Sequence, residues 1–172
     1  MRGARVLAGA GLALALAFCG TGAWTYAEAR GDDSLDYGHQ RDEALADGRR
    51  AIAVLTTLDA SSRARAQAGI RAWSAAATGP LQDELGRTPA KAGASARGTV
   101  TDAAVTALDT RAGTAELIAT VRVDVTPAGS KTPTTDRKRL EAVLARTGAG
   151  QWKVKALDAV PMAGTAQEDD AR

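Results

Sequence analysis

Few side chains in this sequence could carry out proton transfer, nucleophilic attack or metal binding. His39 is the one histidine among the 172 residues, and Cys19 is the one cysteine. A base that works near neutral pH is most often a histidine, and a metal site needs several histidine, cysteine or carboxylate ligands together. Both residues precede the region predicted to fold into a domain. We therefore predict no catalytic residue, no cofactor and no metal.

Among the carboxylates, Asp158 is the one that the sequence pattern places toward the interior of a fold. It shares the even-numbered positions of Trp152 and Val154 in the last predicted strand, whereas Glu116 and Asp124 lie opposite the apolar positions of their strand. If a pocket exists, Asp158 is its candidate acid or base. The interpretation that we favour is a strand-end carboxylate exposed to water.

Two tryptophans of the predicted domain could line a lipid pocket. Trp73 falls on the apolar side of a predicted helix, and Trp152 falls on the apolar side of a predicted strand. In a chain that is 45% hydrophobic but only 3% aromatic, large aromatic side chains at such positions usually form the core. We assign both to the core and expect Trp152 to face the helices that cover the sheet.

The candidate residues lie on a predicted antiparallel meander in the second half of the chain. Apolar residues alternate with polar ones at every second position in segments 114–126, 137–147 and 151–160, as expected for strands that are buried on one face. Segment 100–108 is predicted as the first strand, with a bulge at Ala103 and Ala104. Turns are predicted at 109–113, 127–133 and 148–150.

Apolar residues at helical spacing lie upstream of the predicted strands. The helices that they predict can cover the apolar face of the sheet. We predict helices at 41–59, from an N-cap at Ser61 or Ser62 to residue 77, and at 80–85, followed by a flexible connector at 86–98. Helices followed by a sheet indicate an α+β domain, with two to three helices packed on a curved four-stranded antiparallel sheet. We expect this domain to span residues 41–161.

The N-terminal segment has the features of a membrane anchor. Residues 1–5 carry two arginines, residues 6–27 are uncharged and end near Trp24 and Tyr26, and about 20 apolar residues suffice to cross a bilayer. This layout predicts a cytoplasmic N-terminus and an extracytoplasmic domain, joined by a juxtamembrane linker at 28–40. A signal peptide cleaved after 27–29 (AEA) and a lipoprotein modified at Cys19 are alternatives. Residues 162–172 are predicted to be disordered.

The residues at the joints of this arrangement resemble those of the actinobacterial Mce-associated membrane proteins. The matching segments are 41–45 (RDEAL), 55–59 (LTTLD), 77–85 (ATGPLQDEL), 98–100 (GTV) and 151–154 (QWKV). The resemblance implies a cone of the nuclear-transport-factor-two-like (cystatin-like) type, in a protein that accompanies an Mce lipid importer at the cell envelope. None of these segments is a chemical signature.

We expect a non-enzymatic, single-pass membrane accessory protein that contacts the bilayer through residues 6–27 and envelope transporter subunits through its domain. A formal charge of +2 without a basic block argues against nucleic-acid binding. The alternatives are an exported lipid- or sterol-binding module and a cone-fold enzyme, of isomerase or cyclase type, acting on a hydrophobic small molecule. Charged strand residues of alternating sign are expected to pair across the sheet: Glu116, Arg122, Asp124, Arg139 and Glu141.

Overall fold

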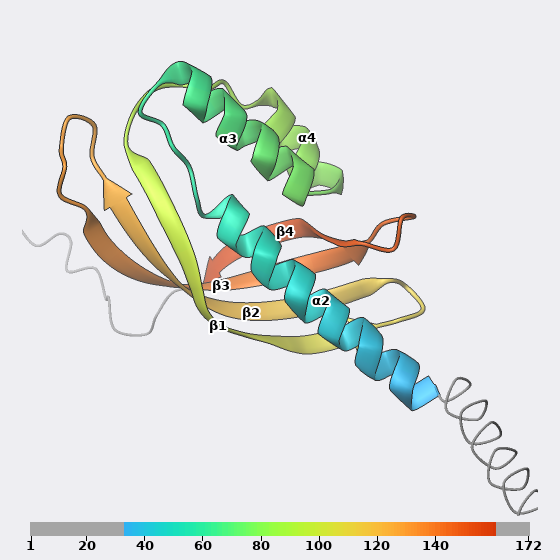
Figure 1. The fold of residues 1–172 in the computed structure, drawn as a ribbon. Helices are drawn as coiled ribbons and strands as arrows, with labels where there is room; N and C mark the ends of the chain where they lie inside the picture. Colours follow the sequence, from blue (N-terminus) through green and yellow to red (C-terminus); the bar gives the residue numbers. More distant parts are fainter. Residues whose placement is uncertain (1–32, 161–172) are drawn as a thin grey trace, which may run out of the picture. The chain divides into compact units, whose positions relative to one another are not determined.

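The computed structural model describes residues 33–160, in which helices precede a sheet as predicted. The helices are α2 (Asp33–Leu55), α3 (Arg63–Ala76) and α4 (Gly79–Arg87), and the strands are β1 (Ser95–Asp109), β2 (Thr114–Thr126), β3 (Thr134–Arg146) and β4 (Trp152–Val160). The strands form one antiparallel sheet in the order β1-β2-β3-β4 (Figure 1). The α+β class and the four-stranded meander are confirmed.

Several predicted segments lie outside the described residues. They are the N-terminal residues 1–5, the anchor 6–27 with Cys19, and the tail 162–172. Within residues 33–160 there is no helix with both the length and the apolar character needed to cross a membrane. The chain divides after His39, and the unit that begins at Gln40 is described by itself.

Helix α2 begins and ends earlier than predicted. It begins at Asp33, so residues 33–40, which we predicted as linker, are helical, and it ends at Leu55 instead of residue 59. Residues 34–37 are exposed, so no apolar periodicity marks them, although acidic residues suit the first turn of a helix. After Leu55 the chain turns to pair with β1, because Leu58 and Ala96 exchange two backbone hydrogen bonds of 2.8 Å.

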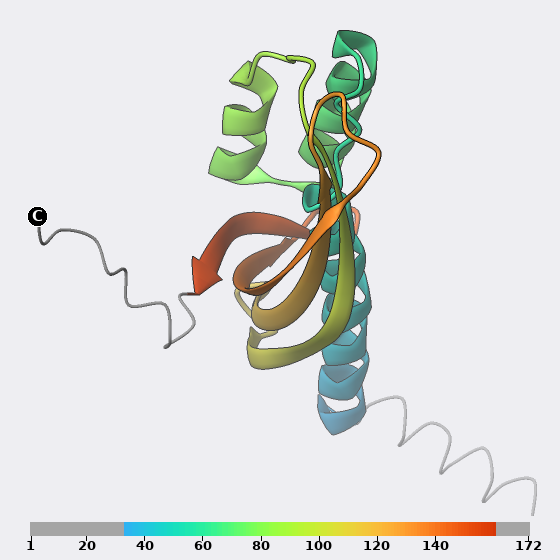
Figure 2. The same ribbon diagram turned by 90° about the vertical axis from the view of Figure 1, so that its left-hand side faces the viewer.

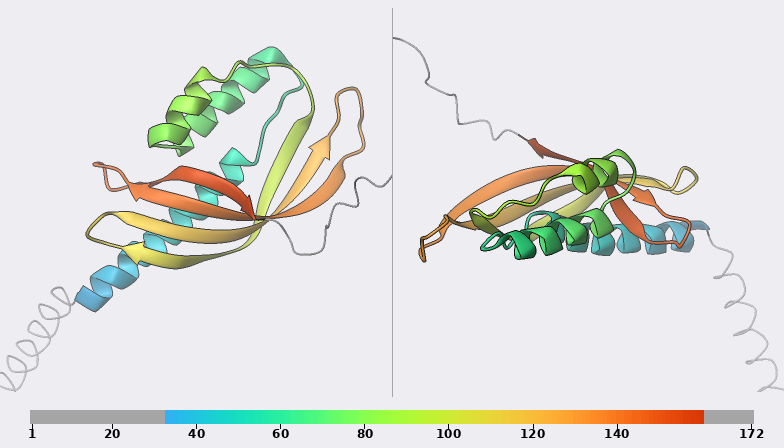
Figure 3. Two further views of the ribbon diagram at one scale, coloured as in Figure 1. Left: turned by 180° about the vertical axis from the view of Figure 1, so that it is seen from behind. Right: turned by 90° about the horizontal axis from the view of Figure 1, so that it is seen from above.

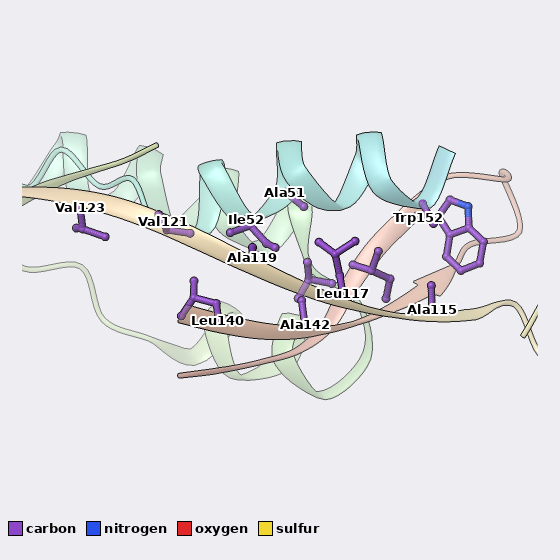
Figure 4. Packing of buried hydrophobic residues seen from close by; sticks show 13 residues of the cluster. Ala51, Ile52, Ala115, Leu117, Ala119, Val121, Val123, Leu140, Ala142 and Trp152 are labelled. Carbon is purple, nitrogen blue, oxygen red and sulfur yellow. The ribbon is translucent and has the colours of Figure 1, made fainter. Parts of the chain in front are cut away.

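The core lies between α2 and the sheet. In Figure 4, Ala51 and Ile52 of α2 face Leu117 of β2 and Ala142 of β3. Small residues on this side of α2 let the helix lie close to the strands, since a Cβ added at Gly48 would come within 2.9 Å of Leu144 Cδ1. The apolar positions predicted for β2 are those that are buried.

The other two helices, α3 and α4, lie beside the end of α2 and strand β4. Ser62 is the N-cap of α3, and its side chain accepts a hydrogen bond from the backbone N–H of Arg65 at 3.3 Å, as the sequence predicts. Helices α3 and α4 pack against each other, and α4 also contacts β4 (Figure 2). The backbone N–H of Thr78 donates to the Val154 carbonyl at 2.8 Å, which joins the α3–α4 turn to the edge of β4.

Strand β1 is longer than predicted. It begins at Ser95, inside the predicted connector 86–98, because residues 95–98 pair with β2 on one side and with the α2–α3 linker on the other. Its pairing with β2 skips Thr101 and Thr106, so bulges lie there and not at Ala103 and Ala104. Both threonine hydroxyls donate to carbonyls of β2, at 3.1 and 3.3 Å. Such bulges twist an edge strand and discourage uncontrolled pairing with other chains.

Candidate functional site

The interior between α2 and the sheet is filled by apolar side chains. Its largest fully buried members are Ile52, Leu117, Val121, Leu144 and Val154. Within residues 33–160 no polar or charged residue is buried. Any chemistry of the described part of the chain therefore belongs to its surface.

Asp158 does not face this interior. The inward position inferred from the parity of Trp152 was wrong, whereas the favoured interpretation of a carboxylate exposed to water is confirmed. The pairing of β3 with β4 runs from Leu144 with Val154 to Val143 with Ala156, so Lys155 is an extra residue, a bulge. A bulge of one residue reverses which positions face the core. Leu157 therefore packs against the core, and Asp158 is exposed on the opposite face beside Glu141.

We call the side of the sheet that faces away from α2 the outer face. The rear view in Figure 3 shows the strands of this face in front of α2. Register and burial assign to it, among others, these residues of β1 to β4: Arg97, Asp102, Ala104, Asp109, Glu116, Ile118, Thr120, Arg122, Asp124, Arg137, Arg139, Glu141, Val143 and Asp158.

Like charges lie opposite each other at two places on the outer face, where pairs of opposite sign were expected. Arg122 lies directly opposite Arg137, and Glu141 lies directly opposite Asp158. No ion pair joins these side chains to one another or to other residues within 33–160. Arg97 and Asp124 do lie opposite each other, but the Asp124 carboxylate accepts a hydrogen bond from Thr135 Oγ1 at 2.6 Å.

Two hollows of opposite charge adjoin on this face. The basic hollow, of about 520 Å³, is lined by Arg137, Lys138 and Arg139 together with Thr120, Ile118 and one carboxylate, Asp102. The acidic hollow, of about 360 Å³, is lined by three carboxylates: Glu116, Glu141 and Asp158. Ile118 lines both. These carboxylates are exposed, so water solvates them.

A third hollow is an apolar groove between α2 and α3. Its volume is about 640 Å³, and small or aliphatic side chains line most of it: Ala53, Val54, Ala68, Gly69 and Ala72. Arg50, Asp59 and Arg65 lie around it. A groove of this size and lining could accept an acyl chain or an apolar peptide side chain.

The two tryptophans are packed as core residues. Trp152 is only 3% exposed, and its backbone N–H donates to Asp47 Oδ2 of α2 at 3.0 Å. The half-buried Trp73 donates its Nε1–H to the carbonyls of Val54 and Thr57, each at 2.8 Å. These two carbonyls lie at the end of α2, and that of Val54 also accepts a hydrogen bond from the backbone N–H of Thr57 at 3.0 Å. Trp73 thus joins α3 to the end of α2.

The remaining candidate residues are not brought into any site. His39 is exposed on α2, in the unit that ends with it. Among residues 33–160 no group of histidine, cysteine and carboxylate side chains has the arrangement of a metal site. Sequence reasoning missed the like-charged neighbours on the outer face, because which charges become neighbours depends on the strand register.

Asp59 is the described carboxylate whose protonation is most clearly perturbed. Hydrogen bonds from the hydroxyl and the backbone N–H of Ser61, at 2.6 and 3.0 Å, and from Arg65 Nη1 at 2.8 Å, lower its pKa from 3.8 to about 2. Each of these bonds favours the charged carboxylate. Asp59 therefore orders the start of α3.

We expect Asp59→Asn to destabilise the domain at neutral pH and to lose this effect in acid. Because the folded-state pKa is depressed, the stabilisation is fully present above pH 3.8 and disappears as the pH falls toward about 2. Urea unfolding of both proteins across this range measures the difference. A difference that does not change with pH would contradict the assigned role of the carboxylate.

Comparisons with known proteins identify no family for this chain but do find a solved structure that is similar to it. No protein-family model matches the sequence, and no curated protein matches it. The chain is similar to a solved structure described as "Ntf2 like protein involved in plasmid conjugation", with 12% identity and a TM-score of 0.49. The match covers 74% of this chain and 51% of that one, so the chain spans about half of its length.

Proposed function

We propose that this protein works by contact with other proteins, as a non-enzymatic accessory protein of the cell envelope that supports an Mce-type lipid import complex. The observation that carries the non-enzymatic part is the filled interior. A cone-type enzyme or carrier would hold its ligand between helices and sheet, where Ile52 and Leu117 are fully buried. The Mce association and the nuclear-transport-factor-two-like cone are proposed from the resemblance of the joint segments.

The enzyme alternative has weaker support. It would need an acid and a base that converge in a pocket from which water is excluded. The carboxylates Glu116, Glu141 and Asp158 do share a hollow, but they are exposed and belong to the face opposite the core. A pair of carboxylates can act as acid and base when a pocket shields it from water, and these three side chains are not shielded.

The apolar groove favours a second candidate, an exported lipid- or sterol-binding module. The groove between α2 and α3 has a volume of about 640 Å³ and a predominantly aliphatic lining around Val54 and Ala72. An acyl chain could lie there, with its headgroup near Arg50 or Arg65. This candidate requires a lipid to accompany the purified protein.

We expect the full chain to remain with membranes through the proposed anchor 6–27, and to recover envelope transporter subunits from them. Carbonate extraction and N-terminal sequencing test the anchor, and pull-down after cross-linking in native membranes tests the partner. Extraction of lipid from the same sample tests the second candidate. Asp158→Asn, which alters an exposed carboxylate outside the core, is the matched control and should change none of these results.

Different outcomes would contradict different parts of this proposal. A soluble product that begins at Arg30 would mean that the chain is cleaved after residues 27–29. Recovery of no protein partner, together with one stoichiometric lipid, would replace the accessory role by lipid binding. Turnover of a hydrophobic substrate that Asp158→Asn abolishes would replace it by the enzyme.

A further inference from the structure

Three arginines at the basic hollow of the outer face have no acidic partner. Arg137 and Arg139 line the hollow, and Arg122 lies directly opposite Arg137 on the neighbouring strand β2. Like charges in this position are destabilising. No ion pair or side-chain hydrogen bond to another residue within 33–160 offsets these three charges. All three side chains are exposed, so a ligand can reach them.

The carboxylates beside these arginines are engaged by other groups. Asp124 accepts a hydrogen bond from Thr135 Oγ1 at 2.6 Å. Asp102, which lines the hollow, accepts one from the backbone N–H of Ala103 at 2.9 Å. Among the described residues neither carboxylate forms an ion pair. Three neighbouring positive charges therefore repel one another, and a bound anion would relieve that repulsion.

We propose that the basic hollow binds a single phosphate group. Arg137 and Arg139 are two residues apart on one face of β3, and the Cβ atoms of such neighbours, like those across from β2, are about 5–8 Å apart. Long side chains from all three arginine positions can therefore reach one anion. A guanidinium group matches phosphate oxygens with two parallel hydrogen bonds. The half-buried Thr120 in the same hollow supplies a hydroxyl donor.

Carboxylates on both sides limit the size of the anion. Asp124 follows Arg122 on the same face of β2, and Glu141 follows Arg139 on the same face of β3. Glu141 belongs to the acidic hollow, together with Asp158. A polyanion such as a nucleic acid would place its further phosphates over these carboxylates, which would repel them. The site therefore favours a compact phosphate monoester or diester.

The hollow has room for more than the phosphate itself. Its volume is about 520 Å³, and Ile118 and Ala104 contribute an apolar part of its lining. The glycerol and first acyl carbons of a phospholipid would contact this apolar part, whereas free phosphate would use the polar groups alone. Both sources present the same phosphate chemistry to the arginines. The site is independent of the proposed envelope role.

Titration of the full chain in an uncharged detergent tests the site. The probes are inorganic phosphate and dihexanoylphosphatidic acid, and phosphorus NMR line broadening reports their binding against a blank of protein-free micelles. We expect Arg137→Gln and Arg139→Gln each to weaken binding by about tenfold, because each removes a charge-assisted pair of hydrogen bonds. Arg71→Gln is the matched control, since it makes the same change at an exposed position of α3 and should leave the affinity unchanged.

Thermal unfolding of the same proteins separates a ligand site from a structural role. Arg137→Gln should raise the melting temperature of the ligand-free protein by roughly 1–3 °C, because it removes the like charge opposite Arg122. Phosphate should raise the melting temperature of the unsubstituted chain and have a much smaller effect on this variant. A lower melting temperature for the ligand-free variant would contradict the repulsion on which the site is based.

The two probes distinguish the sources of the phosphate. Equal affinities would assign the site to free phosphate or a phosphomonoester, and binding of phosphatidic acid that is tighter by about tenfold or more would assign it to a lipid headgroup. Acetate, which offers a carboxylate, should not compete. The proposal is overturned if chloride of equal ionic strength reproduces the effects of phosphate, if acetate competes equally, or if Arg137→Gln and Arg71→Gln bind phosphate alike.

Discussion

Replacing Trp152 with alanine should destabilise the domain by about 3–5 kcal/mol. Its indole is 3% exposed and belongs to the core cluster with Ala51 and Ile52 of α2 and Leu144 of β3. Alanine would leave a cavity in a core that contains few other aromatic side chains. This loss is a large share of the stability of a small domain. Urea unfolding followed by circular dichroism measures it.

Trp152→Phe is the matched control for this experiment. The indole Nε1–H is buried and has no hydrogen-bond partner among the described residues. Phenylalanine removes that donor and keeps most of the ring, so we expect a cost below about 1.5 kcal/mol. Asp158→Asn should cost still less, because the side chain is exposed. If Trp152→Ala left stability unchanged and abolished lipid binding, the indole would line a ligand site instead.

The sequence was most informative where one signal determines the structure. Strand β2 has the predicted bounds, because alternation that only Ile118 interrupts leaves one assignment of faces. An N-cap at Ser61 or Ser62 was predicted, because a serine before a helical pattern satisfies a free backbone N–H, and Ser62 is the one that caps α3. Such local signals do not depend on how the chain packs elsewhere.

The errors arose where a pattern was continued across a local irregularity. Counting every second residue from Trp152 gave Asp158 the parity of the interior, although we favoured an exposed carboxylate, and the bulge at Lys155 reverses that count. Leu157 could have revealed the bulge in the sequence, because an uninterrupted count from Trp152 places this leucine in water and Asp158 in the core. With the bulge, the leucine faces the core and the aspartate faces water, as the polarity of each side chain favours.

The charges of the outer face show a different limit. Arg122, Arg137, Glu141 and Asp158 were each predictable as exposed. Which of them become neighbours depends on the hairpin registers, and these are fixed by the loops 127–133 and 147–151 together with the bulge. The sign pattern along one strand therefore could not predict the pattern across strands.

Gly98→Ala should destabilise the domain by about 3 kcal/mol and lower the melting temperature by roughly 10 °C. Gly98 lies where β1 passes the end of α2, and a Cβ there would overlap Thr56 Oγ1 and lie 2.5 Å from Thr56 Cβ. It would also lie 3.1 Å from the Thr56 backbone carbonyl oxygen, so a change of rotamer cannot relieve the contact. The strand and the helix end would have to move apart.

That movement would break the hydrogen bonds that join the α2–α3 linker to strand β1. The Gly98 backbone N–H donates to Thr57 Oγ1 at 3.0 Å, and the neighbouring Leu58 and Ala96 exchange two hydrogen bonds of 2.8 Å. Thermal unfolding of Gly98→Ala measures the combined loss. Gly86→Ala is the control, because it lies in α4 with no atom near the added Cβ and should be neutral or slightly stabilising.

A double-mutant cycle identifies the cause of the loss. Thr56→Gly removes both side-chain atoms that the new Cβ would meet, at its own cost in helix-end stability. If close approach is the reason that glycine stands at position 98, Gly98→Ala should cost at least about 1 kcal/mol less in the Thr56→Gly background than alone. Strictly additive effects would mean that α2 and β1 are not held at this separation, and the assigned joint between Thr56 and Gly98 would be wrong.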